Sequence, residues 1–246
     1  MTPEAFKRSI RDLQIWCSSC MVAFAGADPI AVLIGAKRSG STLIHKIAVH
    51  PDHRRQGHGR HLLTSLSSKL AILGPPRMVA EVPDTSDAAC ALFSACDYVE
   101  EARLTDYTLA RETPAEPGGH LVIPVTIDDL VANGLLEDHP ATPWARSVET
   151  LTARKDEIEG LAVASDESIE AVVLNVKGGE ILSLRSFIDD GGTRLQHLLS
   201  HLRTRGVRTV TISKVHPGEI AKELLESLGF SPGGVHVLYG ARARSA

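Results

Sequence analysis

The strongest constraint on the fold is the segment 47–66, which reads IAVHPDHRRQGHGRHLLTSL. A strand-like apolar run is followed by a proline turn, by Gly57 and Gly59, and then by leucines at helical spacing. Glycines let the backbone approach an anion closely, and the N–H groups that begin a helix point at it. The neighbouring cations are Arg54, Arg55 and Arg60. The segment therefore predicts a strand–loop–helix unit that binds phosphate groups.

This segment lacks both common nucleotide-binding patterns, G-x-G-x-x-G and G-x-x-x-x-G-K-S/T. Residues 54–59, RRQGHG, instead resemble the R/Q-x-x-G-x-G/A motif of the GCN5-related N-acetyltransferases (GNAT), after that family's V-x-P turn at residues 49–51. Residues 80–98, AEVPDTSDAACALFSACDY, resemble the family pattern L-E-V-x-x-x-N-x-x-A-x-x-L-Y-x-x-x-G-F. The resemblance implies a GNAT fold, an α/β fold with a mixed sheet, and acetyl-CoA as co-substrate.

The resemblance also implies the residues that contact acetyl-CoA. The backbone of Ile47, Ala48 and Val49 would hold the pantetheine arm and the thioester carbonyl, where the strand diverges from its neighbour. The residues that would cradle the pyrophosphate are Arg54, Arg55, Gln56, Gly57, His58, Gly59 and Arg60. Ser86 stands where the family often has a CoA-contacting Asn, and Phe93 where it often has a Tyr that protonates the departing thiolate. Because phenylalanine cannot donate a proton, we expect slower catalysis rather than none.

An amine acceptor must lose a proton before it attacks a thioester, so a base is needed. Glu81 matches the Glu of the family's strand and is the first candidate. His45 is the second, because strand alternation would place it on one face with Leu43, Ile47 and Val49. The alternatives are a solvated carboxylate at a strand end and a half-buried structural histidine.

Metal chemistry is not expected. The five histidines between His45 and His61 are spread over a strand, a turn and a helix start, with no carboxylate or thiol cluster beside them. His197 and His201 are four residues apart but lack the glutamate of H-E-x-x-H. The four cysteines are interpreted as reduced structural thiols.

The chain is predicted to carry one fold twice. Residues 1–112 form the expected acetyl-CoA-binding GNAT domain, the Pro- and Gly-rich stretch 113–119 a linker, and 120–246 a degenerate GNAT-like domain. Laid over the phosphate motif, residues 190–195 read DGGTRL: Asp190 replaces the cation and neither late glycine is kept. The second domain is therefore not expected to bind a pyrophosphate.

Composition bounds the function. A formal charge of −4 and a pI near 6.3 argue against nucleic acid as a partner. The absence of a long apolar run and of a leader-like start predicts a cytoplasmic protein without a membrane partner. The leading hypothesis is an acyl-CoA-dependent N-acetyltransferase that acts on a primary amine. The alternative is a non-catalytic acyl-CoA sensor or scaffold. The sequence fixes neither the acceptor, the acyl-chain preference nor the oligomeric state.

Overall fold

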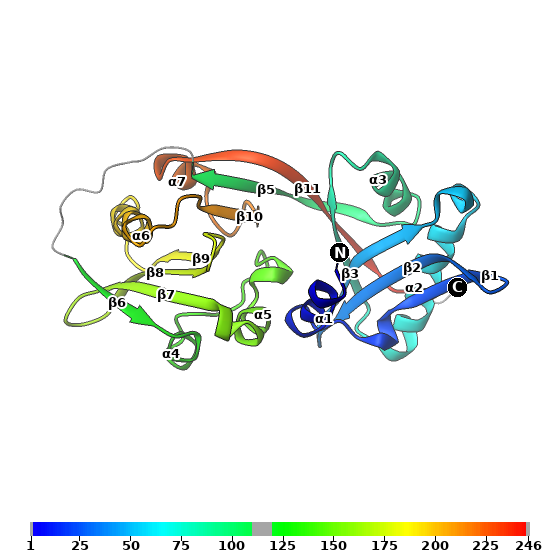
Figure 1. Cartoon of the computed structure of the whole chain (residues 1–246), viewed down its shortest axis with the longest axis horizontal. Coiled ribbons are helices and arrows are strands. Elements are labelled where there is room, and N and C mark those ends of the chain that lie inside the picture. The colour runs from blue at the N-terminus through cyan, green and yellow to red at the C-terminus, as the bar shows by residue number, and fades with distance from the viewer. Residues whose placement is uncertain (1, 110–119, 245–246) are drawn as a thin grey trace. The chain divides into compact units, whose positions relative to one another are not determined.

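The computed structural model describes residues 2–109 and 120–244 (Figure 1). The chain divides into two compact units. Unit 1 contains the described residues up to Arg103 together with those from Val235 onward, and unit 2 runs from Leu104 to Gly234. The helices and strands have the mixed α/β character predicted from the sequence. None of the described helices is both long and apolar enough to span a membrane.

Unit 1 is built on a mixed sheet that begins with an antiparallel meander. Strands β1 (Met21–Ala25), β2 (Asp28–Lys37) and β3 (Thr42–Val49) pair in that order. Strand β4 (Arg77–Pro83) joins β3 in parallel. The last strand of the chain, β11 (Phe230–Arg242), then pairs with β4 in antiparallel register from His236 to Arg242. The helices of the unit are α1 (Pro3–Asp12), α2 (His58–Leu73) and α3 (Asp87–Ser94).

Helix α2 forms because its apolar residues recur on one side. Leu62, Leu66 and Leu70 are buried and pack against Leu33 and the rest of the unit 1 core. Full burial of each leucine contributes about 1.5–3 kcal/mol, so this face holds the helix on the sheet. The helix ends at Gly74, whose N–H donates to the Leu70 carbonyl at 3.1 Å. The helix predicted after the two glycines is confirmed.

Unit 2 contains a four-stranded antiparallel sheet in the order β6 (Leu121–Val125), β7 (Ile158–Ala164), β8 (Ile169–Val176) and β9 (Ile181–Ser186). Its central strand β8 is buried on both faces: Ala171 and Val173 lie in one core, Val172 and Leu174 in the other. The remaining helices are α4 (Ile127–Ala132), α5 (Val148–Ala153), α6 (Thr193–Thr204) and α7 (Lys222–Ser227). Helix α6 packs on the β8 face that carries Ala171 and Val173.

Strands β5 and β11 each contribute residues to both units, which the sequence did not indicate. Strand β5 (Val99–Leu109) begins in unit 1, but its later residues pair with β10 (Thr211–Val215) in unit 2. Strand β11 begins in unit 2, but from Val235 it belongs to unit 1. The compact units therefore do not end at the linker predicted at 113–119, which lies outside the described residues.

Candidate functional site

The candidate site lies where β3 and β4 separate. Parallel pairing between these strands joins only Thr42 to Met78 and Leu43 to Val79, while β3 remains paired with β2 as far as Val49. Among the described residues, the β4-side edge of Ile47, Ala48 and Val49 thus has no strand partner. Backbone groups on that edge can bind an extended ligand. The divergence that the resemblance implied is present.

A β-bulge in β3 changes the predicted position of His45. Ile44 pairs with Gly35 and Lys46 with Ile34, so His45 is an extra residue between two paired ones. Alternation is interrupted there, and Ile44 rather than Leu43 shares the unit 1 core with Ile47 and Val49. The expectation that Leu43, His45, Ile47 and Val49 share one face was therefore wrong.

The loop after β3 delivers the backbone to the start of α2. A short 3-10 turn, Pro51–His53, is followed by Arg55 with φ 60° and Gly57 with φ 87°, both in the left-handed region. Gly57 is the N-cap of α2 and provides no side-chain cap. The first helical bond runs from the His61 N–H to the Gly57 carbonyl at 2.9 Å. The N–H groups of the first turn, residues 58–60, therefore have no acceptor within the helix and can bind an anion.

The two glycines of the motif have different roles. A Cβ at Gly57 would have open space around it, so glycine is required there by φ rather than by packing. A Cβ at Gly59 would lie 3.0 Å from Leu92 Cδ2 on α3. Gly59 thus permits close packing of α2 on α3, whereas Gly57 permits the left-handed turn before the helix.

The motif cations are not equally available. Arg54 Nε donates to the Val49 carbonyl at 3.2 Å, and Gln56 Nε2 donates to the Asp52 carbonyl at 3.1 Å, so these side chains brace the loop. The Arg60 guanidinium bonds the Cys96 thiol, whose pKa is raised by burial and lowered in part by this contact. Arg55 is exposed beside the start of the helix and is the cation best placed to bind a ligand anion.

The two candidate bases lie on neighbouring strands. Glu81 is partly buried on β4 and pairs with Leu238 of β11. Its neighbours Ala80 and Val82 point into the core under α2 and α3. By alternation, the Glu81 side chain leaves the sheet on the opposite face. The structure thus separates Glu81 from the helix side.

Phe93 lies on α3, and Ser86 immediately precedes that helix. Phe93 is 2% exposed and packs between two tyrosines: Tyr98 at 5.1 Å in an edge arrangement and Tyr239 at 5.7 Å in a stacked one. Ser86 is the N-cap of α3 but forms no side-chain cap bond. Tyr239 was not among the predicted site residues, because its place beside α3 follows from the register of β11 with β4.

The histidines near the loop contact each other without forming a metal site. His53 lies between His50 at 5.8 Å and His58 at 6.2 Å, measured between ring centroids. His50 Nδ1 accepts the Asp52 N–H at 3.4 Å. Within residues 2–109 and 120–244, no group of three or more His, Cys, Asp or Glu side chains has a metal-binding arrangement.

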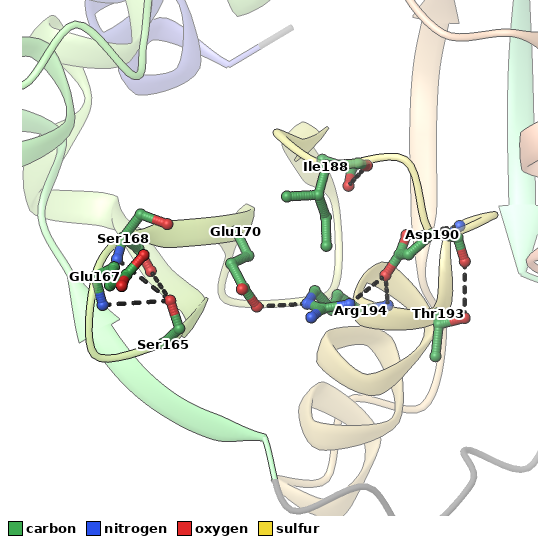
Figure 2. Close-up of polar contacts among 10 residues, drawn as sticks. Ser165, Glu167, Ser168, Glu170, Ile188, Asp190, Thr193 and Arg194 are labelled. Carbon is green, nitrogen blue, oxygen red and sulfur yellow. Dashed lines mark hydrogen bonds and ion pairs between the residues drawn. The ribbon is translucent and has the colours of Figure 1, made fainter.

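In unit 2, helix α6 also begins after a left-handed glycine, but its first N–H groups are bound by the carboxylate of Asp190. Gly192, the N-cap of α6, has φ 87° and ψ 12°, close to the φ 87° and ψ −4° of Gly57. The left-handed glycine is therefore kept, contrary to the sequence overlay, which is one residue out of register. Asp190 accepts the N–H groups of Gly192 at 3.0 Å and Arg194 at 2.9 Å (Figure 2).

The same carboxylate is held by a cation. The Arg194 guanidinium donates to Asp190 at 3.1 Å and also to Glu170 on β8 (Figure 2). Burial alone would raise the pKa of Asp190, but the bonds from Arg194 and Gly192 outweigh it and lower that pKa. An internal anion thus occupies in α6 the position that is open in α2.

Comparison with known proteins agrees with this geometry. Residues 2–98 match the model of the Acetyltransferase (GNAT) family. No curated protein shows significant similarity to the sequence.

Solved structures share the fold at low sequence identity. A GCN5-related N-acetyltransferase from Sphaerobacter thermophilus has a TM-score of 0.65 at 16% identity, over 92% of this chain and 81% of that one. A tandem GNAT protein from the clavulanic acid biosynthesis pathway has a TM-score of 0.63 at 19% identity, over 97% and 88%. A GCN5-related N-acetyltransferase from Anabaena variabilis ATCC 29413 has a TM-score of 0.65 at 11% identity, over 99% and 67%. The likeness extends over both units.

Proposed function

Because residues 2–98 match the model of the Acetyltransferase (GNAT) family, we propose that this protein transfers an acetyl group from acetyl-CoA to a primary amine. The observation that carries the proposal is the divergence of β3 from β4 beside the uncapped start of α2. One element offers an open strand edge, and the other offers unpaired N–H groups. Together they suit a ligand with an amide-containing arm and a pyrophosphate.

The proposed binding mode assigns roles to the described residues. The pantetheine arm lies along Ile47, Ala48 and Val49, and the pyrophosphate contacts the amides of residues 58–60 and the Arg55 side chain. Arg54 and Gln56 hold the loop in shape through their bonds to Val49 and Asp52. Ser86 has a hydroxyl not used for capping, so it can contact the arm from α3.

The proposed reaction begins with deprotonation of the acceptor ammonium by Glu81, with His45 as the second candidate. The amine nitrogen then attacks the thioester carbonyl carbon. A backbone N–H near Val49 stabilises the oxyanion of the tetrahedral intermediate. The nitrogen releases its second proton to water, and the intermediate collapses when the C–S bond breaks, which gives an amide and the CoA thiolate.

Release of free thiol from acetyl-CoA, measured across a broad panel of amines, tests this activity. We expect turnover with at least one amine class and none without an acceptor. Glu81→Gln should lower kcat at neutral pH far more than it weakens acetyl-CoA binding, and His45→Gln gives the comparison. Full activity in both variants would show that neither residue is the base.

A second function is favoured by Phe93. It lacks the hydroxyl of the tyrosine that the family resemblance places at this position to protonate the departing thiolate. In that case the protein binds acyl-CoA as a sensor or scaffold and does not turn it over. Tight acetyl-CoA binding without thiol release above background, over the same amine panel, would support the sensor over the enzyme.

A further inference from the structure

Position 93 on α3 cannot supply a proton to the departing thiolate, because Phe93 carries no hydroxyl. The aromatic cluster around Phe93 nevertheless contains two phenols, Tyr98 and Tyr239. Both rings belong to the unit 1 core, which also includes Ile47 and Val49 from the diverging strand. These two phenols are therefore the candidates to replace the hydroxyl absent at position 93.

The Tyr98 hydroxyl already bonds a side chain of the core. The residue is buried, and its hydroxyl donates to Met78 Sδ at 3.5 Å. This hydroxyl is directed at Met78, which pairs with Thr42 in the part of the sheet where β3 and β4 are still joined. This tyrosine therefore stabilises packing rather than taking part in chemistry.

Tyr239 is placed differently. It pairs with Ala80 on β4, and β4 is the strand from which β3 diverges. Its ring stacks on Phe93 with an interplanar angle of 16°, and its hydroxyl lies close enough to the side chains of Ser94 and Cys90 for both to influence its pKa. Ser94 is exposed, so this hydroxyl is connected to solvent although the residue as a whole is only 6% exposed.

The protonation state of Tyr239 also suits a donor. Burial raises its pKa above the ordinary value of a phenol, with smaller and opposing effects from Ser94 and Cys90. The side chain is therefore a neutral phenol near pH 7 and has a proton to give.

We propose that Tyr239, supplied by the last strand of the chain, donates the proton to the departing CoA thiolate in place of the hydroxyl that Phe93 lacks. This inference rests on the proposed acetyl transfer. As the C–S bond breaks, its electron pair goes to sulfur, and the Tyr239 O–H proton is transferred to that sulfur. The phenolate then regains a proton from water through the exposed Ser94 hydroxyl. The acceptor nitrogen loses two protons, one to the base before attack and one to water after it.

Three variants of the full-length chain test the proposal. Tyr239→Phe removes only the hydroxyl, so we expect kcat to fall roughly 10- to 100-fold with unchanged calorimetric affinity for acetyl-CoA. Tyr98→Phe is the matched control, since it removes the other hydroxyl beside Phe93, and its kcat should stay within about twofold. The double variant Phe93→Tyr with Tyr239→Phe returns a hydroxyl to the same cluster and should recover most of the lost rate.

The outcomes separate the proposal from its premise. If wild-type protein shows no turnover with any amine, the acetyl-transfer function fails, and Tyr239 has no thiolate to protonate. If wild-type protein turns over and Tyr239→Phe keeps its kcat, the proposal is overturned. A loss that Phe93→Tyr does not recover, accompanied by a lower melting temperature, would show that Tyr239 is structural and would equally overturn it.

Discussion

At the scale of single residues, Gly57 has the most specific role. Its φ of 87° is in the left-handed region, and its missing Cβ leaves the start of α2 open. Gly59 has a different role, because a side chain there would crowd Leu92. The two glycines of the motif are therefore required for two separate reasons. A double substitution of both glycines would therefore combine two effects that single variants keep apart.

The Gly57→Leu variant separates ligand binding from backbone strain. A non-glycine residue in the left-handed region costs about 1–2 kcal/mol, so some loss of stability is expected. The matched control is Gly26→Leu, because Gly26 also has a positive φ of 64° and open space but lies in the β1–β2 turn. Both variants should melt at lower temperature, but only Gly57→Leu should lose the rise in Tm that acetyl-CoA gives. Equal rises in both would show that Gly57 does not border the binding site.

At the scale of elements, α2 and α6 begin with the same left-handed glycine but with opposite chemistry. The N-terminus of α6 is satisfied by Asp190, which is held in turn by Arg194 and Glu170. A bound phosphate would meet this carboxylate instead of free N–H groups. The local sequence indicated the loss of the phosphate site, because an acidic residue stood where a cation was expected. It did not indicate that the carboxylate caps the helix.

Replacing Asp190 with Asn should destabilise unit 2 at neutral pH by about 1 kcal/mol, because a charged acceptor of two N–H groups is lost at a partly exposed site. The folded-state pKa of Asp190 is lowered, so its contribution to stability is present above the unfolded pKa and disappears as pH falls through the folded value. Denaturant titrations should therefore show a wild-type advantage at pH 7 that shrinks below about pH 4. An advantage that persists at low pH would contradict the capping role.

Helix α6 also carries a pH-dependent feature. The pKa of His197 is lowered by burial and then by His120 and His201, and its ring lies 5.7 Å from that of His120. Because the neutral form is favoured in the folded state, stability is present above the unfolded pKa of about 6.5 and is lost as pH falls through the folded pKa. His197→Gln should flatten the decline in Tm between pH 7.5 and 5.5. If Tm declines equally in the variant and the wild type, His197 does not cause the pH dependence of stability.

At the scale of the whole molecule, the sequence predicted the elements that border the candidate site. Leucines at helical spacing predicted α2, and the apolar run before the proline turn predicted the strand that leads to it. The bulge at His45 could not be predicted, because it depends on which residues of β2 pair with β3. The position of Tyr239 depends in the same way on a pairing between residues far apart in the chain.

The folding of unit 1 depends on the last residues of the chain, because β11 pairs with β4 from His236 to Arg242. Deletion of all residues after Gly234 removes the β11 segment that pairs with β4 and exposes the edge beside Met78, Ala80 and Val82. We expect the truncated protein to lose the cooperative unfolding of unit 1 and its acetyl-CoA binding. As a control, removal of residues 245–246 should change neither property. A truncated protein that still binds acetyl-CoA would show that β11 is dispensable.

Titration calorimetry of the full-length protein with acetyl-CoA tests the central claim most directly. The diverging strand and the open start of α2 provide one site in unit 1, and Asp190 closes the corresponding position in unit 2. We predict one acetyl-CoA bound per chain, with binding abolished by Gly57→Leu and unaffected by Asp190→Asn. Absence of binding, or binding that survives Gly57→Leu, would contradict this account.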